Sequence, residues 1–267
     1  SSNIQNFVED YYYSVGLTFL LLVGDISQIP SPSVGGSASD PTYGFIEGND
    51  SYGEVIVGRF SAENSSHVIT QVERVINYER YPAASGDWYT TALGVASDQG
   101  PGDDNETDCQ HVENINDILN DYNYDDTSEI CDPSGSVSQG VNAINNGVSV
   151  INYTGHGSDQ CWGNGAPLCN SDVNNLENNG MLPFIWSVAC VNGAFQNGTC
   201  FGEAWLRATN DGGPSGAIGF FGSTVNQSWS PPMEAQDEFN DILVETDKDT
   251  SIKCKSIDHP CIFWQSK

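Results

Sequence analysis

The sequence predicts an α/β fold in which mostly parallel strands form sheets flanked by helices. Short apolar runs of strand length alternate with segments whose apolar residues recur at helical spacing, which is typical of a parallel sheet covered on both faces. The chain has 267 residues, enough for one large or two small domains, and 38% of them are hydrophobic, which supplies a core. No apolar run reaches the ~20 residues that a membrane-spanning helix requires, so no membrane span is expected.

The first part of the chain is predicted to contain two strands and a helix. The continuous apolar run at 17–23 predicts a buried strand, and residues 54–60 predict a second one. A helix over 66–81 follows, because its apolar residues lie at positions i, i+1, i+4, i+7 and i+8. Either Ser65 or Ser66 can cap this helix.

A proline- and glycine-containing stretch, 82–86, separates this part from a second alternating series. The series is predicted as a strand at 92–97, helices at 108–122 and 136–146, a strand at 148–153, a short helix at 171–179, a strand at 183–189, a helix at 201–210, a strand at 217–221 and a helix at 232–244. We therefore divide the chain into an N-terminal subdomain (1–84), a second subdomain (85–245) and an atypical cysteine-containing tail (246–267).

The charge is strongly negative and unevenly placed. Lys plus Arg is 8 and Asp plus Glu is 36, which gives a net charge of -28. This balance excludes nucleic-acid binding by phosphate neutralisation, because such binding needs clustered cations. Residues 81–206 contain no Lys or Arg, against 17 Asp and Glu. Such a stretch is either a solvated acidic surface or one that attracts Ca²⁺ or basic substrates.

Eight cysteines at irregular spacing indicate an oxidising compartment. They are Cys109, Cys131, Cys161, Cys169, Cys190, Cys200, Cys254 and Cys261. No CxxC pair is present, so the sequence does not predict a zinc ribbon. We therefore expect an extracellular or cell-surface protein with several disulfides.

Two predicted strand ends carry residues suited to catalysis. In open parallel sheets, the working residues gather beyond the carboxyl ends of the strands. His156 follows one strand between two glycines, and Cys190 ends the next strand along the chain. If these strands are neighbours, the imidazole can activate the thiol as a thiolate, and the glycines let backbone N–H groups approach a developing oxyanion. The pattern predicts a Cys/His hydrolase; the alternative is a buried structural thiol beside an unrelated loop histidine.

Six motifs run in order between about residue 4 and residue 245. They are 20–25 (LLLVGD), 58–63 (GRFSAE), 152–158 (NYTGHGS), 188–193 (VACVNG), 223–229 (STVNQSW) and 233–238 (MEAQDE). Together they closely resemble the gingipain family of cysteine peptidases (peptidase family C25), most of all its arginine-specific members. The resemblance implies a caspase-like fold with two side-by-side subdomains, the second of them catalytic. It implies that the first subdomain, 1–84, lacks its front part. It also implies a secreted cysteine endopeptidase that cleaves after basic residues, with Arg preferred.

The resemblance further implies a role for each site residue. Cys190 would be the nucleophile and His156 the general acid and base, with an oxyanion hole formed by the backbone N–H groups of Gly157 and Cys190. Asp108 would bind the guanidinium of the substrate's P1 residue, and Trp229 would flank that side chain. The alternative for Asp108 is a carboxylate that stabilises the N-terminal dipole of its helix.

The sequence departs from the family at the acidic neighbour of the catalytic histidine. That position falls at Gln99, preceded by Asp98, so both residues are candidates for orienting His156. The implied chemistry requires no cofactor, and calcium is expected only as a structural ion without assigned ligands. The expected partners are protein or peptide substrates with a basic P1 residue, and an extracellular assembly.

A free Cys190 leaves seven other cysteines, so at least one more must be unpaired. The predicted bridges are Cys161–Cys169, Cys254–Cys261 and, as a further candidate, Cys109–Cys131. These pairs would leave Cys200 as the second free thiol.

Two other functions stay open at this point. A sortase-like transpeptidase would use the same nucleophile and base, but an amine rather than water would resolve its thioester. A non-proteolytic structural or adhesive module of an extracellular assembly would retain the gingipain fold without its chemistry.

Overall fold

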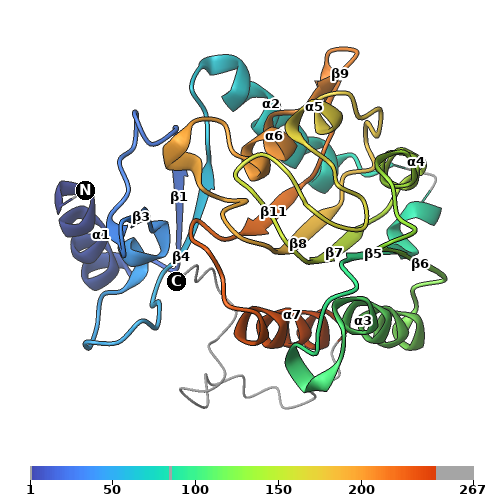
Figure 1. The fold of residues 1–267 in the computed structure, drawn as a ribbon. Helices are drawn as coiled ribbons and strands as arrows, with labels where there is room; N and C mark the ends of the chain where they lie inside the picture. Colours follow the sequence, from blue (N-terminus) through green and yellow to red (C-terminus); the bar gives the residue numbers. More distant parts are fainter. Residues whose placement is uncertain (1, 84–85, 245–267) are drawn as a thin grey trace.

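Two parallel sheets and two short hairpins organise the residues that this computed structural model describes, 2–83 and 86–244 (Figure 1). The helices are α1 (Ser2–Val15), α2 (Ser65–Arg80), α3 (Asp108–Tyr122), α4 (Val137–Asn146), α5 (Asn170–Val173), α6 (Phe201–Arg207) and α7 (Ser230–Leu243). The strands are β1 (Phe19–Val23), β2 (Ser33–Val34), β3 (Ser37–Ala38), β4 (Ile56–Phe60), β5 (Thr91–Ala96), β6 (Asp126–Cys131), β7 (Val150–Thr154), β8 (Phe184–Val188), β9 (Thr209–Asn210), β10 (Gly213–Pro214) and β11 (Gly219–Gly222).

The larger sheet has five parallel strands in the order β11-β8-β7-β5-β6. Its central strands β5, β7 and β8 are almost entirely buried, because helices cover both faces. Helices α3 and α7 lie on one face, and α4, α5 and α6 pack on the other (Figure 1). The predicted α/β class, with a parallel sheet flanked by helices, is therefore confirmed.

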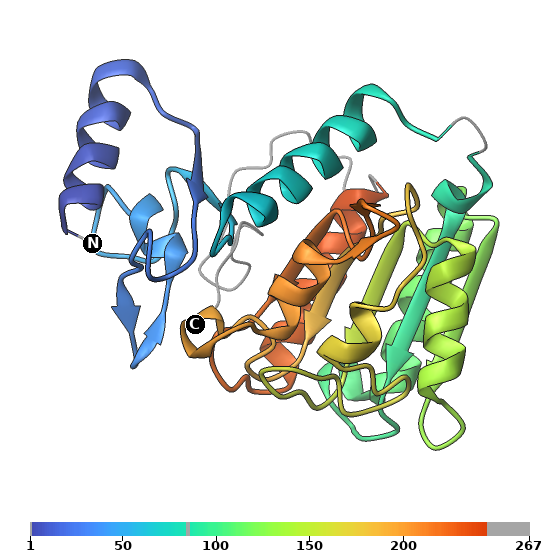
Figure 2. The same cartoon turned by 90° about the horizontal axis from the view of Figure 1, so that it is seen from above.

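The smaller sheet pairs β1 with β4 in parallel and lies to one side of the larger one, beside α1 (Figure 2). The prediction of a buried strand at 17–23 is wrong for most of that strand. Phe19, Leu21 and Val23 are exposed, whereas Leu22 is buried. The cause is that the described residues cover only one face of this sheet.

Helix α2 belongs to the predicted N-terminal subdomain, but it packs against elements of the second one. It packs against α6 and β10, and its Arg74 is buried. The guanidinium donates to the backbone carbonyls of Trp205 and Ala208 at the end of α6 and to that of Ser215. Burial lowers the pKa of Arg74 to about 9. The division of the chain at 84/85 stays a prediction.

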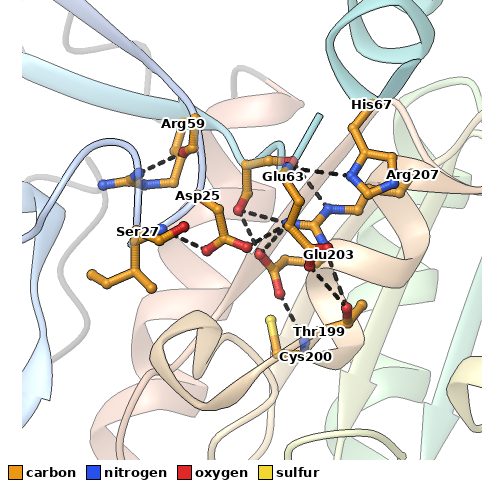
Figure 3. Close-up of polar contacts among 12 residues, drawn as sticks. Asp25, Ser27, Arg59, Glu63, His67, Thr199, Cys200, Glu203 and Arg207 are labelled. Atoms are coloured by element: carbon orange, nitrogen blue, oxygen red, sulfur yellow. Dashed lines mark hydrogen bonds and ion pairs between the residues drawn. The ribbon is translucent and has the colours of Figure 1, made fainter. Parts of the chain in front are cut away.

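A second cation, Arg207 on α6, lies among side chains from both parts of the chain (Figure 3). Its guanidinium pairs with Asp25 at 3.1 Å, Glu63 at 2.8 Å and Glu203 at 2.6 Å. Asp25 follows β1 and Glu63 follows β4, so this cluster fixes the ends of the small sheet to α6.

Several predicted boundaries differ from the structure. Asn64, not a serine, caps α2, because its side chain accepts from the backbone N–H of His67. The helix predicted at 171–179 ends at Val173, and the one predicted at 201–210 ends at Arg207 because residues 209–210 pair with β10. The sequence patterns do not predict helix α1 or the strands β2, β3, β6, β9 and β10.

The tail at 246–267 lies outside the described residues, as does the predicted bridge Cys254–Cys261. Within the described residues, no helix is long and apolar enough to cross a membrane.

Candidate active site

The carboxyl ends of three adjacent strands bring the predicted site residues together. Strand β7 lies between β5 and β8, with Thr154 opposite Ala96 on one side and Val188 on the other. His156 and Cys190 therefore lie two residues beyond paired positions of neighbouring strands. The two strands are therefore neighbours, which the Cys/His interpretation requires, and the equivalent position beyond β5 is Asp98.

The turn after β8 holds Cys190 in a half-buried position. Its Sγ lies 3.9 Å from the backbone oxygen of Gln227. The next residue, Val191, has a φ of 52°, which a β-branched residue rarely adopts. The backbone N–H of Val191 donates to the oxygen of Val225 at 3.0 Å, and this bond holds the unusual turn in place. The sharp turn directs the chain away from the sheet directly after Cys190, the predicted nucleophile.

His156 is exposed on a loop that buried groups hold firmly. Its backbone N–H donates to Asn164 Oδ1 at 2.9 Å, and the buried Tyr153 hydroxyl donates to its carbonyl. The Tyr153 ring stacks on Trp162 with a centroid separation of 4.4 Å. Gln99 orients the imidazole ring, because its Oε1 lies 3.2 Å from His156 Nε2. With this bond made by Nε2–H, the Nδ1 lone pair is the basic site of the ring.

Of the two residues proposed to orient His156, the structure therefore brings Gln99 to the imidazole. Asp98 is exposed, and no hydrogen bond between its side chain and His156 is found among the described residues. A neutral carboxamide fixes the ring orientation but stabilises an imidazolium less than a carboxylate would.

Gly157 lies directly against the nucleophile's backbone. A Cβ at this position would lie 2.9 Å from the Cys190 oxygen and 2.8 Å from the Ala189 Cβ, so only glycine fits. Neither the Gly157 N–H nor the Cys190 N–H donates to an acceptor within the described residues. Both N–H groups are therefore available for the predicted oxyanion hole.

Asp108 is fully buried at the start of α3. Trp229 Nε1 donates to its Oδ1 at 2.6 Å, and the Ser97 hydroxyl donates to its Oδ2. Burial raises the pKa of Asp108, while these two hydrogen bonds act in the opposite direction. The Trp229 ring also meets the His156 ring edge-on, with centroids 5.1 Å apart. Trp229 thus contacts both the predicted general base and the predicted specificity carboxylate.

Two disulfides brace the surrounding loops and confirm two of the predicted bridges. Cys109–Cys131 ties the first turn of α3, next to Asp108, to the end of β6. Cys161–Cys169 closes the loop that follows His156.

The other free thiol, Cys200, differs sharply from Cys190. It is buried, and burial raises the pKa of its thiol. It lines a cavity of about 270 Å³ between β4 and α2 on one side and α6 and β11 on the other, which contains neither Cys190 nor His156. Cys200 is therefore a structural cysteine, and Cys190 is the accessible one.

Some supporting residues were not predicted from the sequence. Ser97 donates to Asp108, Tyr153 holds the His156 loop, and Asn192 accepts from Ser187 Oγ at 2.9 Å beside the nucleophile. Ser97 was detectable as the last residue of a predicted strand. No comparable pattern marks Tyr153 or Asn192. The Tyr153 hydroxyl bonds to the backbone of the loop that follows its own strand. The Asn192 amide nitrogen donates to backbone oxygens of the same loop, which is more than 30 residues away.

Comparisons with known proteins bear on this arrangement. The sequence model of peptidase family C25 matches residues 1–253. Gingipain R2 of Porphyromonas gingivalis is 45% identical over 247 residues, which make up 91% of this chain and 33% of that protein. Lys-gingipain of the same organism is 26% identical over 222 residues, 81% of this chain and 12% of that protein.

A solved structure extends the similarity to the fold. The crystal structure of the Arg specific cysteine proteinase gingipain R superposes with a TM-score of 0.90 at 42% identity, covering 93% of this chain and 58% of that chain. The predicted caspase-like architecture is therefore confirmed. The chain spans about a third of the length of the Gingipain R2 relatives and a quarter or less of the Gingipain R1 relatives. The alternative of a non-proteolytic module is not favoured by these similarities.

Proposed function

Because the chain belongs to peptidase family C25, we propose that it is a cysteine endopeptidase that cleaves after arginine. The observation that carries this proposal is the placement of Cys190 and His156 at the ends of the neighbouring strands β8 and β7. A thiol and an imidazole on adjacent rigid strands are the pair that acyl transfer needs.

The first half of the reaction forms a thioester. His156 Nδ1 takes the proton of the Cys190 thiol, and the thiolate sulfur attacks the carbonyl carbon of the scissile peptide bond. The carbonyl oxygen becomes an oxyanion, which accepts from the N–H groups of Gly157 and Cys190. When the C–N bond breaks, His156 returns its proton to the leaving amine.

The second half consumes water. His156 removes a proton from a water molecule, whose oxygen attacks the thioester carbon. A second oxyanion forms at the same pair of N–H donors, and its collapse breaks the C–S bond. His156 returns its proton to the departing sulfur, which regenerates the Cys190 thiol, and the product carboxylic acid leaves.

Asp108 is the proposed partner of the substrate's P1 guanidinium. A carboxylate offers about four lone-pair sites, and Ser97 and Trp229 occupy one each. The remaining capacity suits the fork of an arginine side chain. The Trp229 ring beside Asp108 gives the aliphatic part of that side chain an apolar wall.

We expect Asp108→Asn to lower kcat/KM for arginyl peptide substrates by roughly 100–1000-fold, because it leaves the bound guanidinium without a counter-charge at a buried site. The amide keeps the shape of the carboxylate, so the contacts with Ser97 and Trp229 can persist. Steady-state kinetics measures the loss. Asp121→Asn, an exposed change on the same helix, should leave kcat/KM unchanged. Alkylation of Cys190 by the uncharged reagent iodoacetamide should proceed at the wild-type rate; a parallel loss there would contradict the specificity role.

We expect Gln99→Glu to raise kcat about fivefold, because a carboxylate at Nε2 stabilises the imidazolium by about 1 kcal/mol more than the neutral carboxamide does. Steady-state kinetics measures the gain. The matched change Asp98→Glu keeps the charge and should leave kcat unchanged. A kcat that Gln99→Glu does not alter would mean that Gln99 does not orient the ring.

We also propose that the protein works outside the cell or at its surface. Two disulfides within one domain support an oxidising compartment.

The experiment that tests the proposed function is labelling with an arginyl chloromethyl ketone, followed by mass-spectrometric mapping of the modified residue. Alkylation of Cys190, faster than with the lysyl reagent, is the expected result. Equal or faster labelling by the lysyl reagent would contradict the arginine preference while leaving the mechanism intact. Absence of labelling by both reagents in folded, reduced protein would contradict the peptidase proposal itself.

A further inference from the structure

Glu106, His111 and Asp237 meet where α3 packs against α7. One atom from each, a ring nitrogen and two carboxylate oxygens, lie within 4.8 Å of one another. Among the described residues, this is the one group of three or more His, Cys, Asp or Glu side chains arranged in this way. His111 is fully buried, whereas the two carboxylates are partly exposed.

A series of hydrogen-bonded side-chain amides determines which ring nitrogen of His111 is protonated. The Asn240 amide nitrogen donates to the backbone oxygen of Gln236 at 2.8 Å, which fixes the orientation of that amide. The same nitrogen lies 3.1 Å from Asn152 Oδ1, and so does the side-chain nitrogen of Gln236. The remaining Gln236 atom must therefore be oxygen. It faces His111 Nε2 at 3.1 Å and accepts from the Thr154 hydroxyl at 2.8 Å.

His111 therefore donates through Nε2–H, and a neutral imidazole has no second proton to donate. Its Nδ1 lone pair nevertheless faces Glu106 Oε1 at 2.8 Å and Asp237 Oδ1 at 3.6 Å. Three acceptors converge on one point at the edge of the core, and acceptors do not pair with one another. A proton, carried by Nδ1 or by one of the two carboxyl groups, or a metal ion must therefore lie between them.

We propose that Glu106, His111 and Asp237 bind a divalent transition-metal ion of the zinc type. Zinc accepts imidazole nitrogen and carboxylate oxygen at about 2.0–2.2 Å, so tetrahedral ligands lie roughly 3.3 Å apart, between the two separations observed here. Metal-bound histidines almost always donate their other N–H to an oxygen, as His111 does to Gln236. Calcium takes oxygen ligands only, so this site does not fit the calcium ion that the family resemblance implies.

The position of the site gives the ion a structural task. Glu106 lies two residues before Asp108, and Asp237 lies on the helix that begins directly after Trp229. An ion here ties α3 to α7 and so fixes the spacing between the predicted specificity carboxylate and the tryptophan beside it. This structural role of the ion rests on the proposed function, whereas metal binding by the three residues does not.

Direct binding tests the proposal without any reliance on peptidase activity. The full chain with Cys190→Ala, which removes the catalytic thiol as a competing ligand, is stripped with a chelator and titrated calorimetrically with Zn²⁺ or with Ca²⁺. We expect Zn²⁺ to bind much more tightly than Ca²⁺. Adding Asp237→Asn should weaken zinc binding by more than the roughly 10–100-fold that loss of an outer hydrogen-bond partner costs. Adding Asp117→Asn, an exposed change of the same charge on α3, should not.

Crystals of the zinc-loaded Cys190→Ala protein supply a second measurement that needs no further variant. Anomalous scattering at the zinc edge should place the ion within bonding distance of His111 Nδ1. An ion bound only elsewhere would overturn the proposal, and so would zinc affinity that Asp237→Asn leaves unchanged. Nitrogen NMR that finds both ring nitrogens of His111 protonated in the presence of zinc would assign the site to an imidazolium ion pair instead.

Discussion

Replacement of Cys190 by alanine is expected to reduce hydrolysis of arginyl peptide substrates by roughly 10⁴–10⁶-fold, the scale of loss when a covalent nucleophile is removed. The reason is that Cys190 is the one accessible free thiol among the described residues. The second free thiol, Cys200, is buried in the cavity beside α6 and its pKa is raised. Steady-state kinetics measures the loss, and burst kinetics should show that acyl-enzyme no longer accumulates.

The matched control is Cys200→Ala, which removes a thiol of the same kind from outside the site. It should retain wild-type kcat and KM, and circular dichroism of both variants should match the parent. If activity survives in Cys190→Ala but disappears in Cys200→Ala, Cys200 is the nucleophile and the assignment is wrong. If both variants retain full activity, the reaction does not use a thiol nucleophile at either position.

The pairing of His156 with Cys190 was predictable because it depends on a rule of parallel sheets. Each residue follows an apolar strand, and in open parallel sheets the catalytic and binding residues lie beyond the carboxyl ends of the strands. The one missing fact was whether the two strands are neighbours, which the sheet order now supplies. The residue that orients His156 was predicted only as either Asp98 or Gln99. Adjacent residues in a loop can point in opposite directions, and the sequence does not show which of the two faces the imidazole.

The unpredicted elements share a physical cause. Strand β6 lies at the edge of the sheet and buries only Ile130, so its sequence shows no apolar run. Helix α1 buries only Val8, and its exposed aromatic residues obscure any helical period. Where packing uses few side chains, the apolar pattern that predicts secondary structure is weak.

Polar contacts between distant segments were the hardest to predict. Glu106 and His111 lie at one helix start, whereas Asp237 comes from the last described helix. The network of Asn152, Gln236 and Asn240 is buried between the sheet and α7, where apolar residues would be expected. Neither periodicity nor local spacing encodes such pairings, which only the packing of α3, α7 and β7 creates.

Arg207→Met is expected to lower the free energy of unfolding by about 3–5 kcal/mol, because it leaves buried carboxylates without their cation. The Arg207 side chain is 6% exposed, and its partners Asp25 and Glu203 are 9% and 3% exposed. Methionine keeps much of the side-chain volume, so loss of charge, rather than a cavity, dominates the effect. The exposed Arg80, changed to methionine in the same way, should cost less than about 1 kcal/mol.

The loss should depend on pH in a defined direction. Burial already raises the pKa of Glu203, and Arg207 opposes that rise. Without Arg207 the folded-state pKa rises further above the unfolded value, so the folded variant binds more protons than the unfolded chain, and its stability falls as pH increases. Urea unfolding should therefore show a larger difference between variant and parent at about pH 7 than at about pH 5. A difference that is constant over this range, or larger at the acidic end, would mean that the cost of Arg207→Met comes from lost packing and not from the stranded carboxylates.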